Sequence, residues 1–471
     1  MTSKKEGLPS TSTVSRHVSR RQFLKATGLA AGALALAACA PGQPGAATGG
    51  AATAPTEIDV WFPFPLTPEP GEKIHPFAQM LKDFNEKGNT GVTANVLTTN
   101  WNMEKLITAI AGGTPPDSFY MDRYIGNEWG ARKLLTSLDP YFEASSKVKK
   151  EDIWPELLKD VTWKGTTYGA PMYTDVRAFY WNKDIFSDAG LDPEKQPATW
   201  AELEDYTKKI LKTDANGDIE RLGYTPSIGN PPVFLVWYIH LWQLGGEFMN
   251  AEGTKVTFNN EAGVKAMDFL LQCFEWQGGI EKVEKFASAL TPGPGQDVFM
   301  IGKMGMQING DWVPPNFDTY APDLKWGIGY IPIPEGGQRA NYHGGHAWII
   351  PKGAKQPDAS WKLVEYALSE DTQLNVSLNA NVIPAREKLA ESDPYFNGEP
   401  KKHADLRKLF VEEFKHAKWV PTIPGVGEII GINLQFVDEC LRKVKTPEQA
   451  VQAFADGVQK IMDDWQAKLA G

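Results

Sequence analysis

The sequence predicts an α/β protein with at least two domains. Strand and helix patterns alternate between residues 58 and 121, which indicates a parallel sheet with right-handed crossovers. The 416 residues from position 56 onward exceed what one hydrophobic core usually supports. After residue 38, no apolar run approaches the ~20 residues that a membrane-spanning helix needs.

The first elements follow in order along the chain. Residues 58–62, 92–96 and 118–121 are short runs typical of strands. Residues 76–87 and 103–111 have the i, i+3, i+4 spacing of amphipathic helices; Pro76 begins the first of them and Gly88 follows it. Asp122 and Arg123 come directly after the third strand, at the end of the sheet where ligands bind in such folds.

The first 38 residues are interpreted as an export signal. Arg20 and Arg21 form the pair of a Tat signal, and an apolar run of 13 residues follows from Ala26 to Ala38. The run ends at Cys39 in a sequence that resembles a bacterial lipobox, which implies cleavage before Cys39 and lipid on its thiol. The alternative is a short core helix that begins at Phe23.

The chain that remains after cleavage is acidic. The signal holds six Lys or Arg and one Glu, so its removal leaves 42 basic and 57 acidic residues and a net charge of −15. Nucleic acid is therefore not expected as a partner. Residues 40–55 hold no charge and no large apolar side chain, which is typical of a flexible tether.

The stretch from Tyr168 to Lys183 is predicted to cross between domains. Gly169 and Pro171 indicate a bend, and the aromatic and β-branched residues after them favour a strand. Tyr173 and Asp175 are two positions apart, so a strand places their side chains on one side. A ring and a carboxylate on one side can hold a hydroxylated ligand.

This stretch resembles the first crossover of the maltose-binding-like solute-binding proteins, which serve bacterial ABC importers. The residues that fit the family pattern are Gly169, Pro171, Asp175, Asn182 and Lys183, with Trp181 where the family usually has Tyr. The Asp122-Arg123 pair also matches an acidic–basic pair that contributes to the sugar site in these relatives. The resemblance implies a two-lobed periplasmic-binding-protein fold (type II) with a ligand cleft at the hinge.

A second motif of this family lies at residues 302–312. The pattern is Gly-Lys-x-x-Met followed by Gly-x-Trp, and here it begins at Gly302 and ends at Trp312. The resemblance implies that Trp312 stacks on the ligand. The run lacks the earlier Gly and the following Ser or Thr of a phosphate loop, so nucleotide binding is rejected.

The later crossovers resemble the family as well. Residues 344–351 resemble the second crossover, and residues 383–386 the third. Residues 231–244 resemble the helix whose aromatic side chain reaches the ligand, a place that Tyr238 fits, although core packing is the alternative. The implied organisation is a signal at 1–38, a tether at 39–56, lobe 1 at 57–171 and 344–385, and lobe 2 at 172–343 and 386–471.

Local patterns predict further features of the second half. Thr199 and Glu202 form a capping box, residues 263–277 have helical spacing, and Thr446-Pro447 opens the last helix. Residues 214–220 resemble half of a calcium loop but lack its turn glycine, so a polar hairpin turn is expected. Cys273 and Cys440 are expected as buried thiols, with a disulfide as the alternative.

The family pattern is broken near residue 430. Maltose-binding relatives have a Trp and an Arg a few residues past the Pro-x-x-Pro loop at 421–424, and this chain has Ile430 and Leu434 there. The departure argues against maltose itself as the ligand.

Aromatic and acidic side chains make up most of the predicted site. The chain has 16 Trp and 14 Tyr, and such rings pack against the C–H faces of sugars while carboxylates bind their hydroxyls. No catalytic residue, metal ligand or cofactor is expected. The predicted ligand-binding residues are Trp61, Trp101, Asp122, Arg123, Tyr173, Asp175, Tyr238, Trp312, Gly344, Gly345, His346 and Trp348.

Together these observations predict a monomeric lipoprotein of an ABC importer. It is expected to be anchored by Cys39 to the outer face of the cytoplasmic membrane, to capture a carbohydrate, and to deliver it to the permease. One alternative is a secreted glycosidase with Asp122 and Asp175 as its paired carboxylates. Another is a receptor for polyamines or other cations, which rings and carboxylates can cage.

Overall fold

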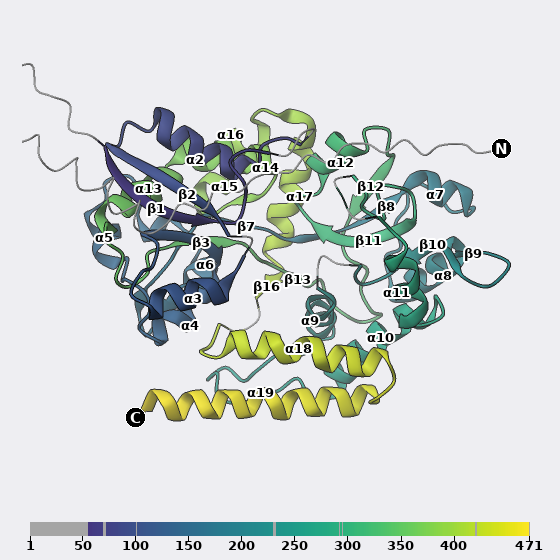
Figure 1. Cartoon of the computed structure of the whole chain (residues 1–471). Helices are drawn as coiled ribbons and strands as arrows, with labels where there is room; N and C mark the ends of the chain where they lie inside the picture. Colours follow the sequence, from purple (N-terminus) through teal and green to yellow (C-terminus); the bar gives the residue numbers. More distant parts are fainter. Residues whose placement is uncertain are drawn as a thin grey trace, which may run out of the picture. The chain divides into compact units, whose positions relative to one another are not determined.

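The computed structural model describes residues 55–68, 72–99, 101–228, 232–291, 293, 295–419 and 422–470, all within one compact unit, Pro55–Gly471. The predicted export signal with Arg20 and Arg21, and Cys39 with most of the tether, lie outside the described residues. The described helices and strands are arranged around two five-stranded sheets (Figure 1).

The first sheet has the strand order β2-β1-β3-β14-β6. Its strands are β1 (Thr56–Phe62), β2 (Val92–Thr98), β3 (Ser118–Asp122), β6 (Ala170–Pro171) and β14 (His346–Ile349). The first three are parallel, as the alternation with α2 (Pro76–Lys87) and α3 (Met103–Ala111) predicted. β14 pairs with β3 in the antiparallel direction, although it follows β3 by more than two hundred positions in the chain.

The second sheet has the order β12-β8-β11-β10-β9. Its strands are β8 (Arg177–Asn182), β9 (Lys212–Thr213), β10 (Ile219–Tyr224), β11 (Met304–Gly310) and β12 (Trp326–Gly329). β10 and β11 are parallel, whereas β8 runs antiparallel to both β11 and β12. β8 and β11 are buried along their whole length, and residues 178–181 of β8 form a continuous apolar and aromatic run.

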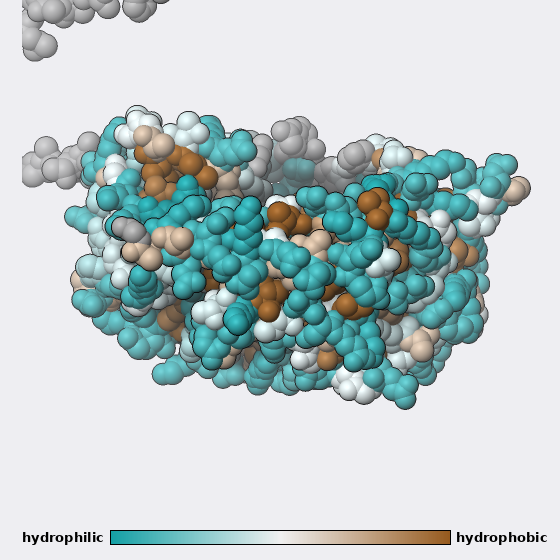
Figure 2. Space-filling view, turned by 90° about the horizontal axis from the view of Figure 1, so that it is seen from below, coloured by the Kyte–Doolittle hydropathy of each residue, from teal (hydrophilic) through white to brown (hydrophobic). Residues whose placement is uncertain are grey.

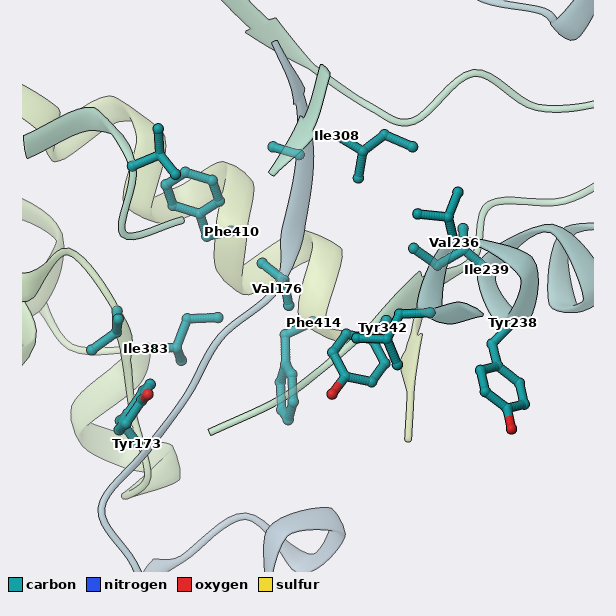
Figure 3. Packing of buried hydrophobic residues seen from close by; sticks show 14 of the residues in the cluster. Tyr173, Val176, Val236, Tyr238, Ile239, Ile308, Tyr342, Ile383, Phe410 and Phe414 are labelled. Atoms are coloured by element: carbon teal, nitrogen blue, oxygen red, sulfur yellow. The ribbon is translucent and has the colours of Figure 1, made fainter. Parts of the chain in front are cut away.

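Short strand pairs hold the segments that pass between the sheets. β7 (Tyr173–Thr174) pairs with β15 (Ile383–Pro384), and β13 (Asn341–Tyr342) pairs with β16 (Ala417–Lys418). α17 (Ala404–Phe414) contacts β8, β13 and β15. Figure 3 shows Tyr173 beside Ile383, with Val176 and Phe414 between this pair and Tyr342. The crossovers therefore share one apolar core.

Two long helices close the chain. α18 (Val426–Leu441) and α19 (Pro447–Ala470) pack against each other, and both contact α10 (Glu261–Glu275). Figure 2 shows that the face seen from their side is mostly hydrophilic, with small separate apolar patches. None of the described helices, including the 24 residues of α19, combines the length and apolar content of a membrane span.

The remaining elements flank the sheets and crossovers. They are α4 (Tyr124–Ala131), α5 (Asp139–Ala144), α6 (Pro155–Asp160), β4 (Thr162–Trp163), β5 (Thr166–Thr167), α7 (Lys183–Asp188), α8 (Trp200–Ile210), α9 (Val233–Gln243), α11 (Ile280–Ser288), α12 (Pro314–Tyr320), α13 (Pro357–Ala367), α14 (Glu370–Ala380), α15 (Glu387–Ala390) and α16 (Asp393–Asn397).

The predicted hairpin at residues 214–220 is present. The carboxylate of Asp214 accepts hydrogen bonds from the amides of Asn216 at 2.8 Å and Asp218 at 2.9 Å, and the turn connects β9 to β10. Lys285 pairs with Asp218 at 2.6 Å. Cys273 and Cys440 are both buried and free, so the thiol prediction is confirmed and the disulfide alternative is wrong.

The predicted cap of α8 differs from a standard capping box in one bond. Thr199 Oγ1 accepts a hydrogen bond from the amide of Glu202 at 3.1 Å, as expected. Glu202 reaches back to the amide of Ala198 at 2.7 Å, one residue earlier than the cap itself. The side chains of Thr199 and Glu202 thus satisfy two amides at the start of α8.

We expect Thr199→Ala to lower the free energy of unfolding by ~1 kcal/mol, because an amide in the first turn of α8 loses its partner. Urea denaturation followed by far-UV circular dichroism measures the change. Lys208→Ala on the exposed side of α8 is the control and should stay within ~0.5 kcal/mol of the wild type. Equal stability of both variants would show that the cap contributes nothing.

Candidate ligand-binding site

A cavity of about 450 Å³ lies among segments that come from both sheets. Elements of the first sheet reach it at the ends of β1 and β3, and elements of the second sheet reach it at the start of β8 and the end of β11. It is lined by Phe64, His75, Pro76, Phe77, Trp101, Asp122, Tyr173, Asp175, Arg177, Trp312, Pro315, Asn316, Tyr342, Gly344, Gly345, His346, Asn379, Ala380 and Val382.

The structure brings most of the predicted site residues together around this cavity. Eight of the twelve line it: Trp101, Asp122, Tyr173, Asp175, Trp312, Gly344, Gly345 and His346. They come from five separate stretches of the sequence. Their convergence follows from the two sheets and the crossovers between them, because strand ends and crossovers lie at the same place.

Stacked rings form the wall nearest the first sheet. Trp101 stacks on His346 with ring centroids 4.5 Å apart and meets Phe64 edge-on at 5.6 Å. His75 stacks on Phe64, with ring centroids 3.7 Å apart. Trp101 is 37% exposed, so part of its surface is free to contact a ligand.

His346 links Tyr173 to Asp122. Its Nδ1 lies 2.5 Å from the hydroxyl of Tyr173, and its Nε2 lies 3.4 Å from Oδ1 of Asp122. Burial raises the pKa of Tyr173, so its hydroxyl stays protonated at neutral pH. The side chain of Asp122 is 41% exposed and is a carboxylate open to the cavity.

Asp175 and Arg177 form a buried ion pair beneath the opposite wall. Nη1 of Arg177 lies 2.6 Å from Oδ1 of Asp175, which also accepts a hydrogen bond from the amide of Gly344 at 3.0 Å. The guanidinium lies between two rings, 4.7 Å from Trp312 and 4.8 Å from Tyr342. Such cation–π contacts hold the rings in place.

The Gly-x-Trp motif has a steric explanation. A Cβ atom on Gly310 would lie 2.1 Å from the ring of Trp312, a distance that no side chain can adopt. Glycine at 310 therefore lets the Trp312 ring fold back over the end of β11. Gly345 is constrained in a similar way: its φ is +119°, and a Cβ there would lie 2.2 Å from Arg123.

Asp311 is buried behind this wall. The residue is fully inaccessible, and neither of its carboxylate oxygens has a hydrogen-bond partner among the described residues. Burial raises its pKa well above the usual range, and the nearby charge of Asp175 adds to this effect. Its surroundings therefore oppose ionisation of Asp311.

Three predicted residues lie in packed regions away from the cavity. Trp61 is on the other face of β1, where Lys105 lies 5.0 Å over its ring. Trp348 is fully buried and stacks on Phe62 at 5.8 Å. Tyr238 is also fully buried, donates to Asn433 at 3.1 Å, and lies on α9 far from Tyr173 in Figure 3.

Arg123 is close to the cavity but does not line it. It is 2% exposed, and its guanidinium is occupied by Asp160 at 3.1 Å, the carbonyl of Tyr173 at 2.7 Å and His343 at 3.1 Å. Arg123 thus contacts the crossovers, and its predicted contact with a ligand stays a prediction. An acidic–basic pair in sequence could not show that the two side chains point to different surroundings.

Sequence reasoning missed three lining residues of particular interest. Arg177 could have been found, because it follows Asp175 by two positions and shares its side of the chain. His75 and Tyr342 gave no signal of their own, since His75 lies just before α2 and Tyr342 belongs to β13, a strand of only two residues. No group of three or more potential metal ligands occurs in the part of the chain that the structure describes.

Residues 70–374 match the family model of bacterial extracellular solute-binding proteins. The chain belongs to this family. Residues 17–37 match the twin-arginine translocation signal sequence, in agreement with the predicted Tat signal. Both matches place the folded part of this solute-binding protein outside the cytoplasm.

Relatives and solved structures agree with this assignment. A binding protein of Brucella abortus (strain 2308) is 27% identical over 380 residues, which cover 76% of this chain and 83% of the relative. The diacetylchitobiose-binding protein DasA of Streptomyces coelicolor is 26% identical over 393 residues, which cover 79% and 83%. A crystal structure of an ABC transporter solute-binding protein from Thermotoga lettingae TMO with α-D-tagatose is 26% identical, with a TM-score of 0.72 over 86% of this chain and 100% of that one.

We expect acid to destabilise this solute-binding protein partly through His75. Burial, with a smaller effect of His346, lowers the pKa of His75 to about 4. The unfolded chain, with a histidine pKa of ~6.5, then binds more protons than the folded one, so stability falls as pH drops from ~6.5 to ~4. His75→Phe should reduce the stability lost between pH 7.5 and 4.5 by ~2 kcal/mol in urea denaturation.

His416→Gln is the control for this measurement, because His416 is partly exposed and lies outside the cavity lining. It should leave the pH dependence close to that of the wild type. If His75→Phe loses as much stability as the wild type on acidification, the imidazole of His75 is not buried in its neutral form.

Proposed function

We propose that this protein binds a carbohydrate in the cavity and delivers it to the permease of an ABC importer. The observation that carries the proposal is the convergence of rings and carboxylates from both sheets. Trp101 and Asp122 approach from one side, and Trp312 and Asp175 approach from the other. A sugar offers C–H faces to such rings and hydroxyl groups to such carboxylates.

The relatives support a carbohydrate as the ligand class. DasA is named for diacetylchitobiose, and the Thermotoga lettingae protein was crystallised with tagatose. These two sugars differ in size and substitution. The comparison therefore favours the class of ligand and leaves the particular sugar to experiment.

Closure of two lobes over the ligand is part of the proposal. We assign lobe 1 to residues 57–171 and 344–385, and lobe 2 to residues 172–343 and 386–471. A ligand closes such lobes only if it binds the closed form better than the open one. Contacts with Trp101 on one lobe and Trp312 on the other would supply this difference.

Binding without turnover fits the carboxylates better than glycoside hydrolysis does. A glycosidase needs one carboxyl group that donates a proton and a second that acts as a base or nucleophile. Asp175 is engaged by Arg177 at 2.6 Å and by the amide of Gly344 at 3.0 Å, which holds it as a hydrogen-bond acceptor. We therefore propose that neither Asp122 nor Asp175 is catalytic.

The proposed protein is a monomer tethered by lipid on Cys39 to the outer face of the cytoplasmic membrane. The lipobox-like sequence ends directly at Cys39, and residues 40–55 have the composition of a flexible linker. Such a tether would keep the receptor near the permease while leaving it free to rotate.

We expect Trp312→Ala to weaken carbohydrate binding ~30- to 1,000-fold, or ~2 to 4 kcal/mol, because a large ring leaves the cavity wall. Isothermal titration calorimetry against a panel of neutral mono- and disaccharides identifies the ligand and measures the loss. Trp163→Ala is the control, since Trp163 is partly exposed and does not line this cavity. Unchanged affinity in Trp312→Ala, with a lower unfolding midpoint, would assign Trp312 to the core.

We expect Cys39→Ser to abolish lipid attachment and leave a precursor or a soluble exported protein. Arg20→Lys combined with Arg21→Lys should block export, because the paired arginines are the recognised part of the signal. Metabolic labelling with a radioactive fatty acid and cell fractionation measure both effects. Lipid labelling that persists in Cys39→Ser would rule out this residue as the anchor.

A further inference from the structure

We propose that the cavity selects against acidic carbohydrates and binds neutral or amine-bearing ones, with Asp122 as the residue that sets this charge preference. The inference rests on the proposed function, since it concerns the ligand of the same cavity. Three independent features of the lining carry it: the state of its guanidinium, the state of its carboxylates and the helix ends that reach it.

The guanidinium in the lining is already occupied. Arg177 is 5% exposed, its Nη1 is bound by Asp175, and its guanidinium lies over the rings of Trp312 and Tyr342. The charge of Arg177 is therefore already offset by Asp175. A carboxylate or phosphate on a ligand that paired with Arg177 would lie close to Asp175 and be repelled by it.

The carboxylate of Asp122 lacks such compensation. The side chain of Asp122 is 41% exposed beside the cavity. Its Oδ1 lies 3.4 Å from Nε2 of His346. His75 is neutral at pH 7 because burial lowers its pKa to about 4. The charges of Asp175 and Arg177 cancel each other. Asp122 therefore gives the lining an excess of negative charge, which attracts an ammonium group and repels an anion.

The helix ends at the cavity also fail to favour anions. A helix N-terminus binds anions through its free amides. Pro76 removes one such amide from the start of α2, and Pro314 and Pro315 remove two from the start of α12. α14 presents its opposite end, because Asn379 and Ala380 in its last turn line the cavity. The C-terminal end of a helix carries partial negative charge, which favours a cation.

The test compares related sugars that carry different charges. The probes are glucose, glucosamine and glucuronate; galactose, galactosamine and galacturonate; and diacetylchitobiose with chitobiose. Putrescine serves as an amine without a sugar ring. Dissociation constants are measured by calorimetry on the folded protein without its signal sequence at pH 7, above the ordinary histidine pKa of ~6.5.

In each series that binds, we expect the uronate to bind at least ~10-fold more weakly than the neutral sugar. The amine should bind at least as tightly as its neutral counterpart. Asp122→Asn should shrink the ratio of uronate to neutral dissociation constants ~10-fold and remove any advantage of the amine. Glu261→Gln, which removes a charge from the exposed start of α10, should leave both ratios unchanged.

A uronate that binds as tightly as its neutral counterpart would overturn the charge preference and leave the proposed function intact. Ratios in Asp122→Asn equal to those of Glu261→Gln would overturn the role of Asp122. Binding of putrescine without any sugar would overturn the proposed function and support the preference for cations. If no probe binds, the proposed function and this inference are both overturned.

Discussion

One buried guanidinium holds together the segments that run between the two sheets. The three nitrogens of Arg123 reach Asp160 at the end of α6, the carbonyl of Tyr173 in one crossover and His343 in another. Asp160 is fixed in turn by the hydroxyl of Thr422 at 3.0 Å. A guanidinium donates from three separate nitrogens in a fixed plane, whereas a lysine side chain donates from one nitrogen. Burial of this charge is tolerable because its partners are polar and close.

The cavity is built from the same crossovers. Tyr173 accepts from Arg123 through its carbonyl and contacts His346 through its hydroxyl, so one residue belongs to both the buried centre and the cavity wall. The amide of Gly344 likewise connects a crossover to Asp175 in the lining. The walls are therefore held by backbone groups of the crossovers as well as by side chains. A change in the angle between the sheets would necessarily move the lining residues.

Sequence patterns predicted the elements and much of the site, and failed where side-chain direction mattered. Regular spacing located α2, α3 and β1 to β3, because apolar periodicity depends only on which face is buried. Family motifs located Trp312 and Asp175. Trp61 and Trp348 were predicted from their nearness to strand ends, which does not show where a side chain points. Trp61 lies on the face of β1 opposite Phe62, and Trp348 lies deeper along β14 than His346. Arg177 and Tyr342 belong to a cluster in which the guanidinium contacts the rings of Trp312 and Tyr342. Three segments that are distant in the sequence form this cluster, so local patterns could not show it.

The position of β14 has a consequence during synthesis of the chain. His346 pairs with Asp122, so this edge of β3 stays open until 224 further residues have been made. At ~5 to 20 residues per second, that interval lasts on the order of 10 to 45 s. Open strand edges are templates for wrong pairing. The nascent chain is thus exposed to misassembly at β3 for nearly half of its synthesis, which makes that strand a place where a chaperone would have much to protect.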